Sequence, residues 1–89
     1  MRGFGDQVKS KKKLNYYLTD KKYSQILNEA IKNHSSGNLT EALKYYQYLI
    51  KDGFKDERVF NNYGMILILL GKLKEAELSI RKAIELNPN

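Results

Sequence analysis

Few side chains in this sequence have the type and spacing that catalysis or metal binding requires. His34 is the only histidine and there is no cysteine, so the chain offers neither a multi-histidine nor a thiolate metal site, and no thiol nucleophile. Gly3 and Gly5, in the segment GFG, lack the strand–loop–helix context of a phosphate-binding loop. Glu75 and Glu77 are expected on a solvated helix face. We therefore expect no enzymatic activity, no metal site and no cofactor.

The positive charge is concentrated near the N-terminus. The 89 residues have a formal net charge of +6. Residues 1–22 hold seven basic and two acidic residues, a balance of +5, and nine basic against eight acidic residues leave +1 for the rest. Residues 1–19 have too little apolar content to fold alone, and we expect a flexible, solvated basic leader. The alternative is that KSKKKLNYY binds phosphate groups of nucleic acid or of an anionic membrane surface.

No segment has the character of a membrane span or of a secretory signal. The most apolar run, Met65 to Leu70, has six residues, far below the ~20 that a bilayer requires. The opening MRGFGDQVKSKKK has no apolar stretch behind its charges. We expect a cytoplasmic protein.

The sequence repeats itself with a period of 34 residues, and this repeat must position whatever surface carries the function. A shift of 34 places GNLTEAL, residues 37–43, on GKLKEAE, residues 71–77. The residues that are identical after this shift are Asn28/Asn62, Gly37/Gly71, Leu39/Leu73, Glu41/Glu75, Ala42/Ala76 and Ile50/Ile84. Each copy predicts two helices joined at a glycine.

The second copy has clear helix boundaries. Asp56 is a predicted N-cap for a helix that runs to Leu70. Gly71 ends that helix, because glycine adopts the left-handed conformation without steric penalty. A further helix is predicted over residues 73–86, stopped by Asn87-Pro88.

The first copy predicts helices over residues 20–36 and 40–52, with Gly37 and Gly53 as breaks. The predicted fold is all-α, with four helices in antiparallel pairs. The pairs correspond to residues of about 23–56 and 57–89, preceded by the leader.

This period and pattern resemble the tetratricopeptide repeat family. The second copy has apolar, small and proline residues where the family has its signature, at Phe60, Tyr63, Gly64, Leu67, Ala76, Ile80, Ala83 and Pro88. The first copy is degenerate: Glu29 and Asn33 replace apolar residues, and Phe54 stands where proline is expected. The resemblance implies a fragment of an α-solenoid and a non-catalytic scaffold for protein–protein interaction.

The resemblance also implies where a partner binds, because the first helix of each pair lines the inner surface in this family. The implied partner-binding residues are Leu27, Ile31, His34, Arg58, Asn61, Met65 and Ile68. Only Arg58 and Asn61 could meet a carboxylate, and the mostly apolar remainder suits a helix or a hydrophobic peptide. An equally good interpretation is that these side chains pack inside the two-repeat unit.

Leu78 and Leu86 lie roughly opposite the main apolar face of the last predicted helix. We expect them on a surface that a following repeat would cover, either because the chain is the N-terminal part of a longer protein or because it forms a homodimer there. The alternative function is that of a basic adaptor, in which residues 1–22 bind nucleic acid or an anionic membrane while the helices self-associate.

Overall fold

The computed structural model describes the backbone of residues 4–89 and the side chains of residues 19–89. Within this part the chain forms four helices, α1 (Phe4–Ser35), α2 (Leu39–Lys51), α3 (Glu57–Leu69) and α4 (Leu73–Leu86), and no strand. The predicted all-α fold is confirmed. None of these helices combines the length and the apolar character that crossing a bilayer would require.

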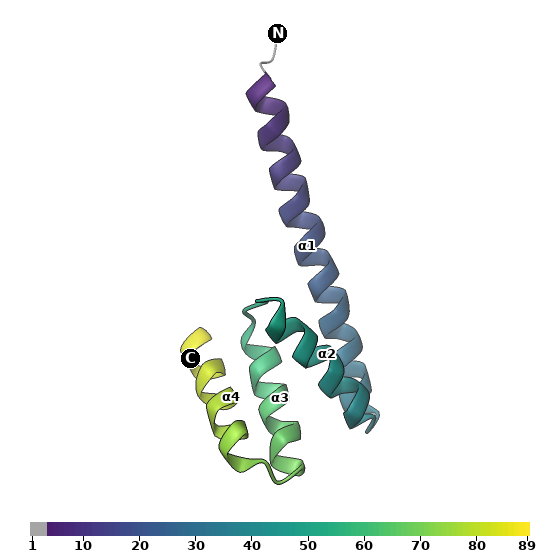
Figure 1. Cartoon of the computed structure of the whole chain (residues 1–89), viewed down its shortest axis with the longest axis vertical. Coiled ribbons are helices and arrows are strands. Elements are labelled where there is room, and N and C mark those ends of the chain that lie inside the picture. Colours follow the sequence, from purple (N-terminus) through teal and green to yellow (C-terminus); the bar gives the residue numbers. More distant parts are fainter. Residues whose placement is uncertain (1–3) are drawn as a thin grey trace.

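Each helix packs against the next one along the chain. Figure 1 shows that successive helices run in opposite directions, so that α1 and α2 form one antiparallel pair and α3 and α4 form the other. The contact between α2 and α3 joins the two pairs. The N-terminal half of α1 extends beyond the other three helices.

The turns inside the two pairs have the same geometry. Gly37 and Gly71 both have positive φ, 82° and 77°, which glycine adopts without the penalty that a Cβ imposes. The amide of Gly37 donates to the His34 carbonyl, and the amide of Asn38 donates to the Asn33 carbonyl. The amides of residues 71 and 72 bond the carbonyls of residues 68 and 67 in the same pattern. The predicted period of 34 is therefore repeated in the main chain as a Schellman turn in each pair.

The start of α1 differs from the sequence-based expectation. The predicted helix began at residue 20, whereas α1 begins at Phe4. The reason is that no glycine or proline occurs between residues 6 and 36, so nothing in the sequence interrupts a helix there. The side chains of the expected leader lie largely outside the described residues, and its mobility stays a prediction.

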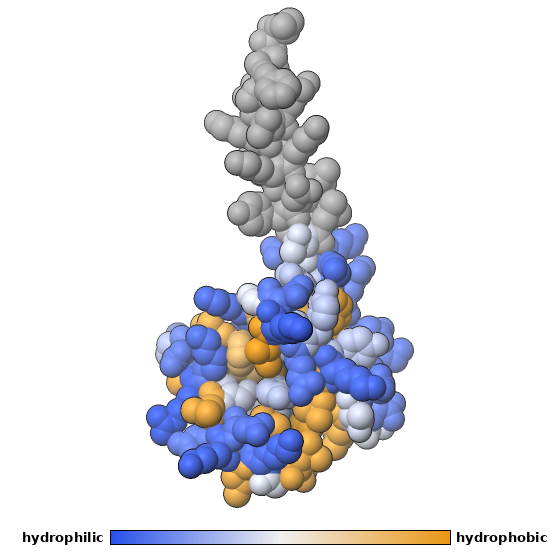
Figure 2. All heavy atoms as spheres, in the orientation of Figure 1, coloured by the Kyte–Doolittle hydropathy of each residue, from blue (hydrophilic) through white to orange (hydrophobic). Residues whose placement is uncertain are grey.

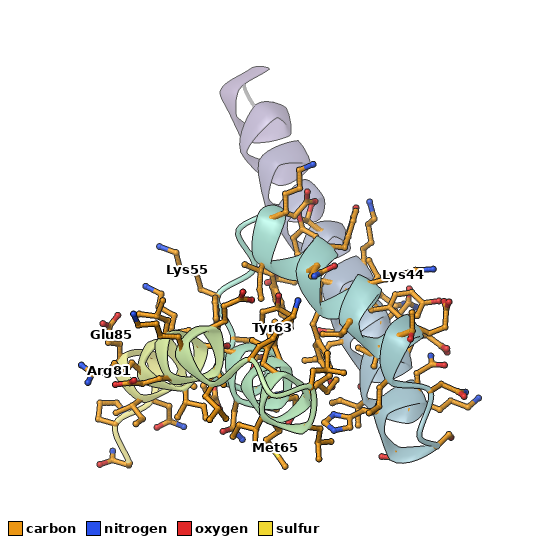
Figure 3. The ribbon with its side chains drawn as sticks, turned by 60° about the horizontal axis from the view of Figure 1, so that its bottom comes forward. Lys44, Lys55, Tyr63, Met65, Arg81 and Glu85 are labelled. Atoms are coloured by element: carbon orange, nitrogen blue, oxygen red, sulfur yellow. The ribbon has the colours of Figure 1, made fainter. Side chains whose placement is uncertain are left out.

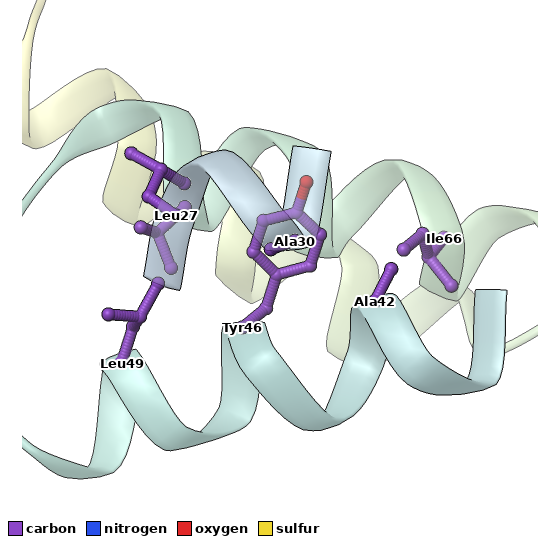
Figure 4. Packing of buried hydrophobic residues seen from close by; sticks show 7 residues of the cluster. Leu27, Ala30, Ala42, Tyr46, Leu49 and Ile66 are labelled. Carbon is purple, nitrogen blue, oxygen red and sulfur yellow. The ribbon is translucent and has the colours of Figure 1, made fainter. Parts of the chain in front are cut away.

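The core is built from small and aliphatic side chains around one tyrosine. Tyr46 of α2 is completely buried and lies beside Ala30 of α1 (Figure 4). The other residues of this buried cluster are Leu27, Ala42, Leu49, Val59 and Ile66. Because Val59 and Ile66 belong to α3, a single core spans both helix pairs.

The second pair closes around Gly64, as expected from its small residues. A Cβ at Gly64 would lie 2.7 Å from Ile80 Cγ1 and 3.3 Å from the Ala76 carbonyl oxygen. Ser79 of α4 also reaches α3, where its hydroxyl donates a 2.6 Å hydrogen bond to the Phe60 carbonyl. These contacts fix how α4 lies on α3.

Candidate interaction surfaces

The inner-face residues expected on α1 are less accessible than the family spacing implied. Leu27 is only 1% exposed and belongs to the core, so it is not available to a partner and its expected role is corrected here. Ile31 and His34 are half-buried. His34 Nδ1 lies 3.4 Å from the Tyr46 hydroxyl, and the two rings meet edge to face. Burial raises the pKa of Tyr46, which keeps its hydroxyl protonated.

The inner-face residues expected on α3 are open to solvent. Met65 and Ile68 are each 47% exposed, and Asn61 is exposed as well. Figure 3 shows Met65 pointing away from the other helices. The helix α3 therefore presents apolar side chains both to the core and to solvent.

Arg58 is already engaged by its own N-cap. The Asp56 carboxylate accepts the Arg58 backbone amide at 2.9 Å, as the predicted cap requires. The same carboxylate accepts Arg58 Nε at 3.0 Å and a terminal guanidinium nitrogen at 2.8 Å. The side-chain hydrogen bond from Arg58 lowers the pKa of Asp56. A ligand carboxylate would have to displace this bidentate pair, so Asn61 is the freer polar group of the two.

Two shallow grooves repeat with the period of the sequence. The first groove, of about 370 Å³, lies between α1 and α2 and is lined by Ile26, Glu41, Lys44, Tyr45 and Tyr48. The second groove, of about 320 Å³, is lined by Phe60, Glu75, Leu78, Ser79 and Lys82 of the second pair. Ile50 of α2 and Tyr63 of α3 line it as well. A shift of 34 converts all five residues of the first groove into five of the second. We name them the outer grooves. Sequence reasoning missed them because their linings mix polar and apolar residues, although the repeat could have indicated both.

The position of Leu78 differs from the expectation that a following repeat would cover it. Leu78 is 69% exposed, but it lines the second outer groove together with Ile50 of α2. It therefore lies on the side of α4 that faces the first pair. Leu78 is six residues from Ile84, which places it about 120° around the helix from that residue. Leu86 is half-buried in the last turn.

The surface of α4 that faces away from the first pair is instead formed by other residues. On α2, the equivalent surface meets α3: Gln47 donates to the Tyr63 hydroxyl at 3.4 Å, and Leu39, Leu43 and Ile50 pack against the core. The counterparts of these four residues at a shift of 34 are Leu73, Glu77, Arg81 and Ile84, and we call them the open edge. Figure 3 shows Arg81 pointing away from α3.

Apolar side chains also gather next to the open edge. Leu69 and Leu70, which end α3, are exposed, as is Leu73 at the start of α4. Figure 2 shows hydrophobic side chains at the lower end of the molecule, where Figure 1 draws the turn between α3 and α4. Among the described residues, no three side chains of the metal-ligating types His, Cys, Asp and Glu are gathered into a possible metal site.

The arrangement defines the chain as an all-α helical-repeat protein whose accessible features are grooves and apolar surfaces. Residues 57–89, which include α3 and α4, match the family model of the tetratricopeptide repeat. Repeats of this family generally mediate protein–protein interaction and are typically non-catalytic. Neither the curated proteins nor the solved structures contain a match to the chain.

Proposed function

We propose that this chain is a non-catalytic protein-interaction module that binds an apolar helix or peptide on its inner face, the surface formed by Ile31, His34, Asn61, Met65 and Ile68. The observation that carries the proposal is the exposure of Met65 and Ile68 on a tetratricopeptide repeat. Two large apolar side chains three residues apart on one helix face form a continuous stripe that water solvates poorly. Leu27 and Arg58 are left out, because the first is buried and the second is paired with Asp56.

The first helix pair is a degenerate copy of the second, and it contributes residues to the same inner face. Its turn and its outer groove repeat at a shift of 34. In that correspondence Ile31 and His34 are the counterparts of Met65 and Ile68. A ligand helix that contacts the second pair would therefore find a further apolar residue and an imidazole in the equivalent place on the first pair.

The proposal predicts an apolar rather than an acidic ligand. A peptide clamp for a terminal carboxylate needs free cationic or amide groups, and on α3 only Asn61 is unoccupied by an ion pair among the polar inner-face residues described. The cytoplasmic location expected from the sequence stays a prediction.

The test is a selection from a random peptide display library, followed by titration of the isotope-labelled protein with the recovered peptides. Binders should contain apolar residues at helical spacing, and the shifted backbone signals should cluster at Ile31, Met65 and Ile68. The double variant Met65→Glu and Ile68→Glu should weaken binding at least about tenfold, which is a loss of about 1.4 kcal/mol.

The matched control is Leu78→Glu, which adds the same charge at an exposed apolar position in the second outer groove. This control should bind as the original chain does. Failure to recover any binder, or binders that respond to Leu78→Glu and not to the inner-face variant, would contradict the proposal.

A further inference from the structure

The open edge has the spacing of a helix–helix seam. Leu73, Glu77 and Ile84 follow one another at intervals of four and seven residues along α4, which is the spacing that keeps a stripe facing a second helix. Leu73 and Ile84, at the two ends of the stripe, are 65% and 56% exposed. Arg81 lies beside the stripe and forms an ion pair with Glu77 at 2.8 Å.

The structure shows what covers such a surface elsewhere in the same chain. On the first pair, the equivalent residues of α2 pack against α3, which contributes the completely buried Val59 and Ile66. The open edge is therefore suited to a helix that presents aliphatic side chains.

The outer side of α1 cannot supply that helix. The counterparts of Val59 and Ile66 on α1 are Gln25 and Lys32, and both are exposed. If copies of the chain stacked head to tail, these polar side chains would be buried against Leu73 and Ile84, and desolvation of the lysine would oppose the contact. An open, growing assembly of copies is therefore disfavoured.

We propose that the open edge binds the open edge of a second copy, so that two α4 helices pack antiparallel about a twofold axis. In this register Leu73 lies against Ile84 of the second copy, and Glu77 lies near Arg81 of the second copy. A twofold axis repeats each of these contacts, so one pattern satisfies both copies. Apolar residues meet apolar residues at the ends, and opposite charges meet in the middle.

This dimer goes beyond the proposed function and leaves Met65 and Ile68 of the inner face free, although Ile84 of the seam and Asn61 of the inner face line one groove. Met65 and Ile68 lie on α3, whereas the proposed seam uses α4. The seam is short, about three helical turns, so the interface belongs to the small, weak class. Monomer and dimer should therefore both be populated, in a ratio that changes with protein concentration.

Sedimentation velocity over a wide concentration range tests the association. The original chain should shift from monomer to dimer and no further. The variant with Leu73→Gln and Ile84→Gln should remain monomeric at concentrations where the original chain is mostly dimeric. The control Leu78→Gln removes an equally exposed leucine from the other side of α4 and should leave the dimer unchanged. Far-UV circular dichroism checks that all variants keep their helix content.

Charge exchange tests the register. In the variant Glu77→Arg, two arginines meet at each of the two symmetric contacts of the dimer. In the variant Arg81→Glu, two glutamates meet there, so each single variant should weaken the dimer. The double variant with both changes restores the opposite-charge pattern and should restore dimerisation. The double variant also restores the ion pair between positions 77 and 81 within one helix, so the register is tested by mixing Glu77→Arg protein with Arg81→Glu protein. In this mixture opposite charges meet only between copies, and a dimer should form.

Cross-linking tests the direction of the helices, which is practical because the chain contains no native cysteine. Leu73→Cys protein mixed with Ile84→Cys protein should form a disulfide-linked pair under mild oxidation. Either variant alone should not, because like residues would lie about 16 Å apart along the axis, too far for a disulfide.

A purely monomeric chain, assembly beyond a dimer, a dimer that only Leu78→Gln disrupts, or cross-linking between like residues would each overturn the proposal. In the first case a different protein or helix pair would be the occupant of the open edge.

Discussion

Gly64 and Ile80 are in such close contact that α3 and α4 have no room for one additional carbon between them. A methyl group on Gly64 would lie 2.7 Å from Ile80 Cγ1, a separation that requires either side chain or helix to move. This contact sets the distance between α3 and α4.

Gly64→Ala should therefore destabilise the fold even though alanine is the better helix former. The helix propensity gained is about 1 kcal/mol, and overpacking in a tight core costs about 1–3 kcal/mol. We expect a net loss, measured as a lower midpoint of urea unfolding. In the background of Ile80→Ala, where the obstructing carbon is absent, the same change should become stabilising. An equal effect of Gly64→Ala in both backgrounds would show that the contact with Ile80 does not limit the packing.

Ala76 contributes to the same close approach from α4. It is 2% exposed, and its carbonyl oxygen is among the atoms nearest to Gly64. Ala76→Leu should lower the free energy of unfolding by about 1–3 kcal/mol. Lys74→Ala, two residues earlier on the exposed face, should change it by no more than about 0.5 kcal/mol. Similar thermal melts for the two variants would mean that the helix phase is wrong.

The cap of α3 should make stability depend on pH. The pKa of Asp56 is lowered, mainly because the Arg58 side chain donates to it. A lowered folded-state pKa adds stability above the unfolded value of about 4, and that stability is lost as the pH falls through the folded-state value. Asp56→Asn keeps a capping side chain without the charge. The original chain should be the more stable at pH 7, and the difference in urea midpoint should shrink below about pH 4. Arg58→Gln should remove part of the same pH dependence, whereas a constant difference at all pH values would contradict this account.

Tyr23 attaches α1 to the end of α2. Its hydroxyl donates to Asp52 Oδ2 at 2.9 Å, and its ring lies 5.2 Å from that of Phe54. The hydrogen bond is exposed, so Tyr23→Phe should cost no more than about 0.5 kcal/mol. Tyr23→Ala also removes the aromatic contact and should cost about 1–2 kcal/mol more. Urea unfolding measures both, and a larger loss from Tyr23→Phe would show that the hydroxyl is the main attachment.

The boundaries of α2, α3 and α4 could be predicted within a residue because a local signal marks each of them. Gly53 and Gly71 have the positive φ that ends a helix, and Asp56 caps the next one. The beginning of α1 had no such signal. The composition changes near residue 20, but lysine is a good helix former and a run of lysines does not end a helix.

The candidate site was harder to predict because burial depends on neighbours that no single repeat contains. Leu27 and Met65 both belong to the first helix of a pair, yet the first lies in the core and the second is exposed. Arg58 has the right position for a ligand carboxylate, but Asp56, two residues before it, already binds its guanidinium. The position of Leu78 on its own helix does not indicate where α2 lies, and Leu78 lines a groove with Ile50 of that helix.

The glycine turns have a consequence for how such a chain can vary over time. Main-chain hydrogen bonds close each of these turns, and the positive φ that they require is supplied by one glycine. Substitutions elsewhere in a helix pair can therefore accumulate while its turn is kept. A sequence comparison can then fail to detect one copy although the geometry of its turn is kept. Divergence among the copies of a repeat is thus easier to trace by its turns than by its signature residues.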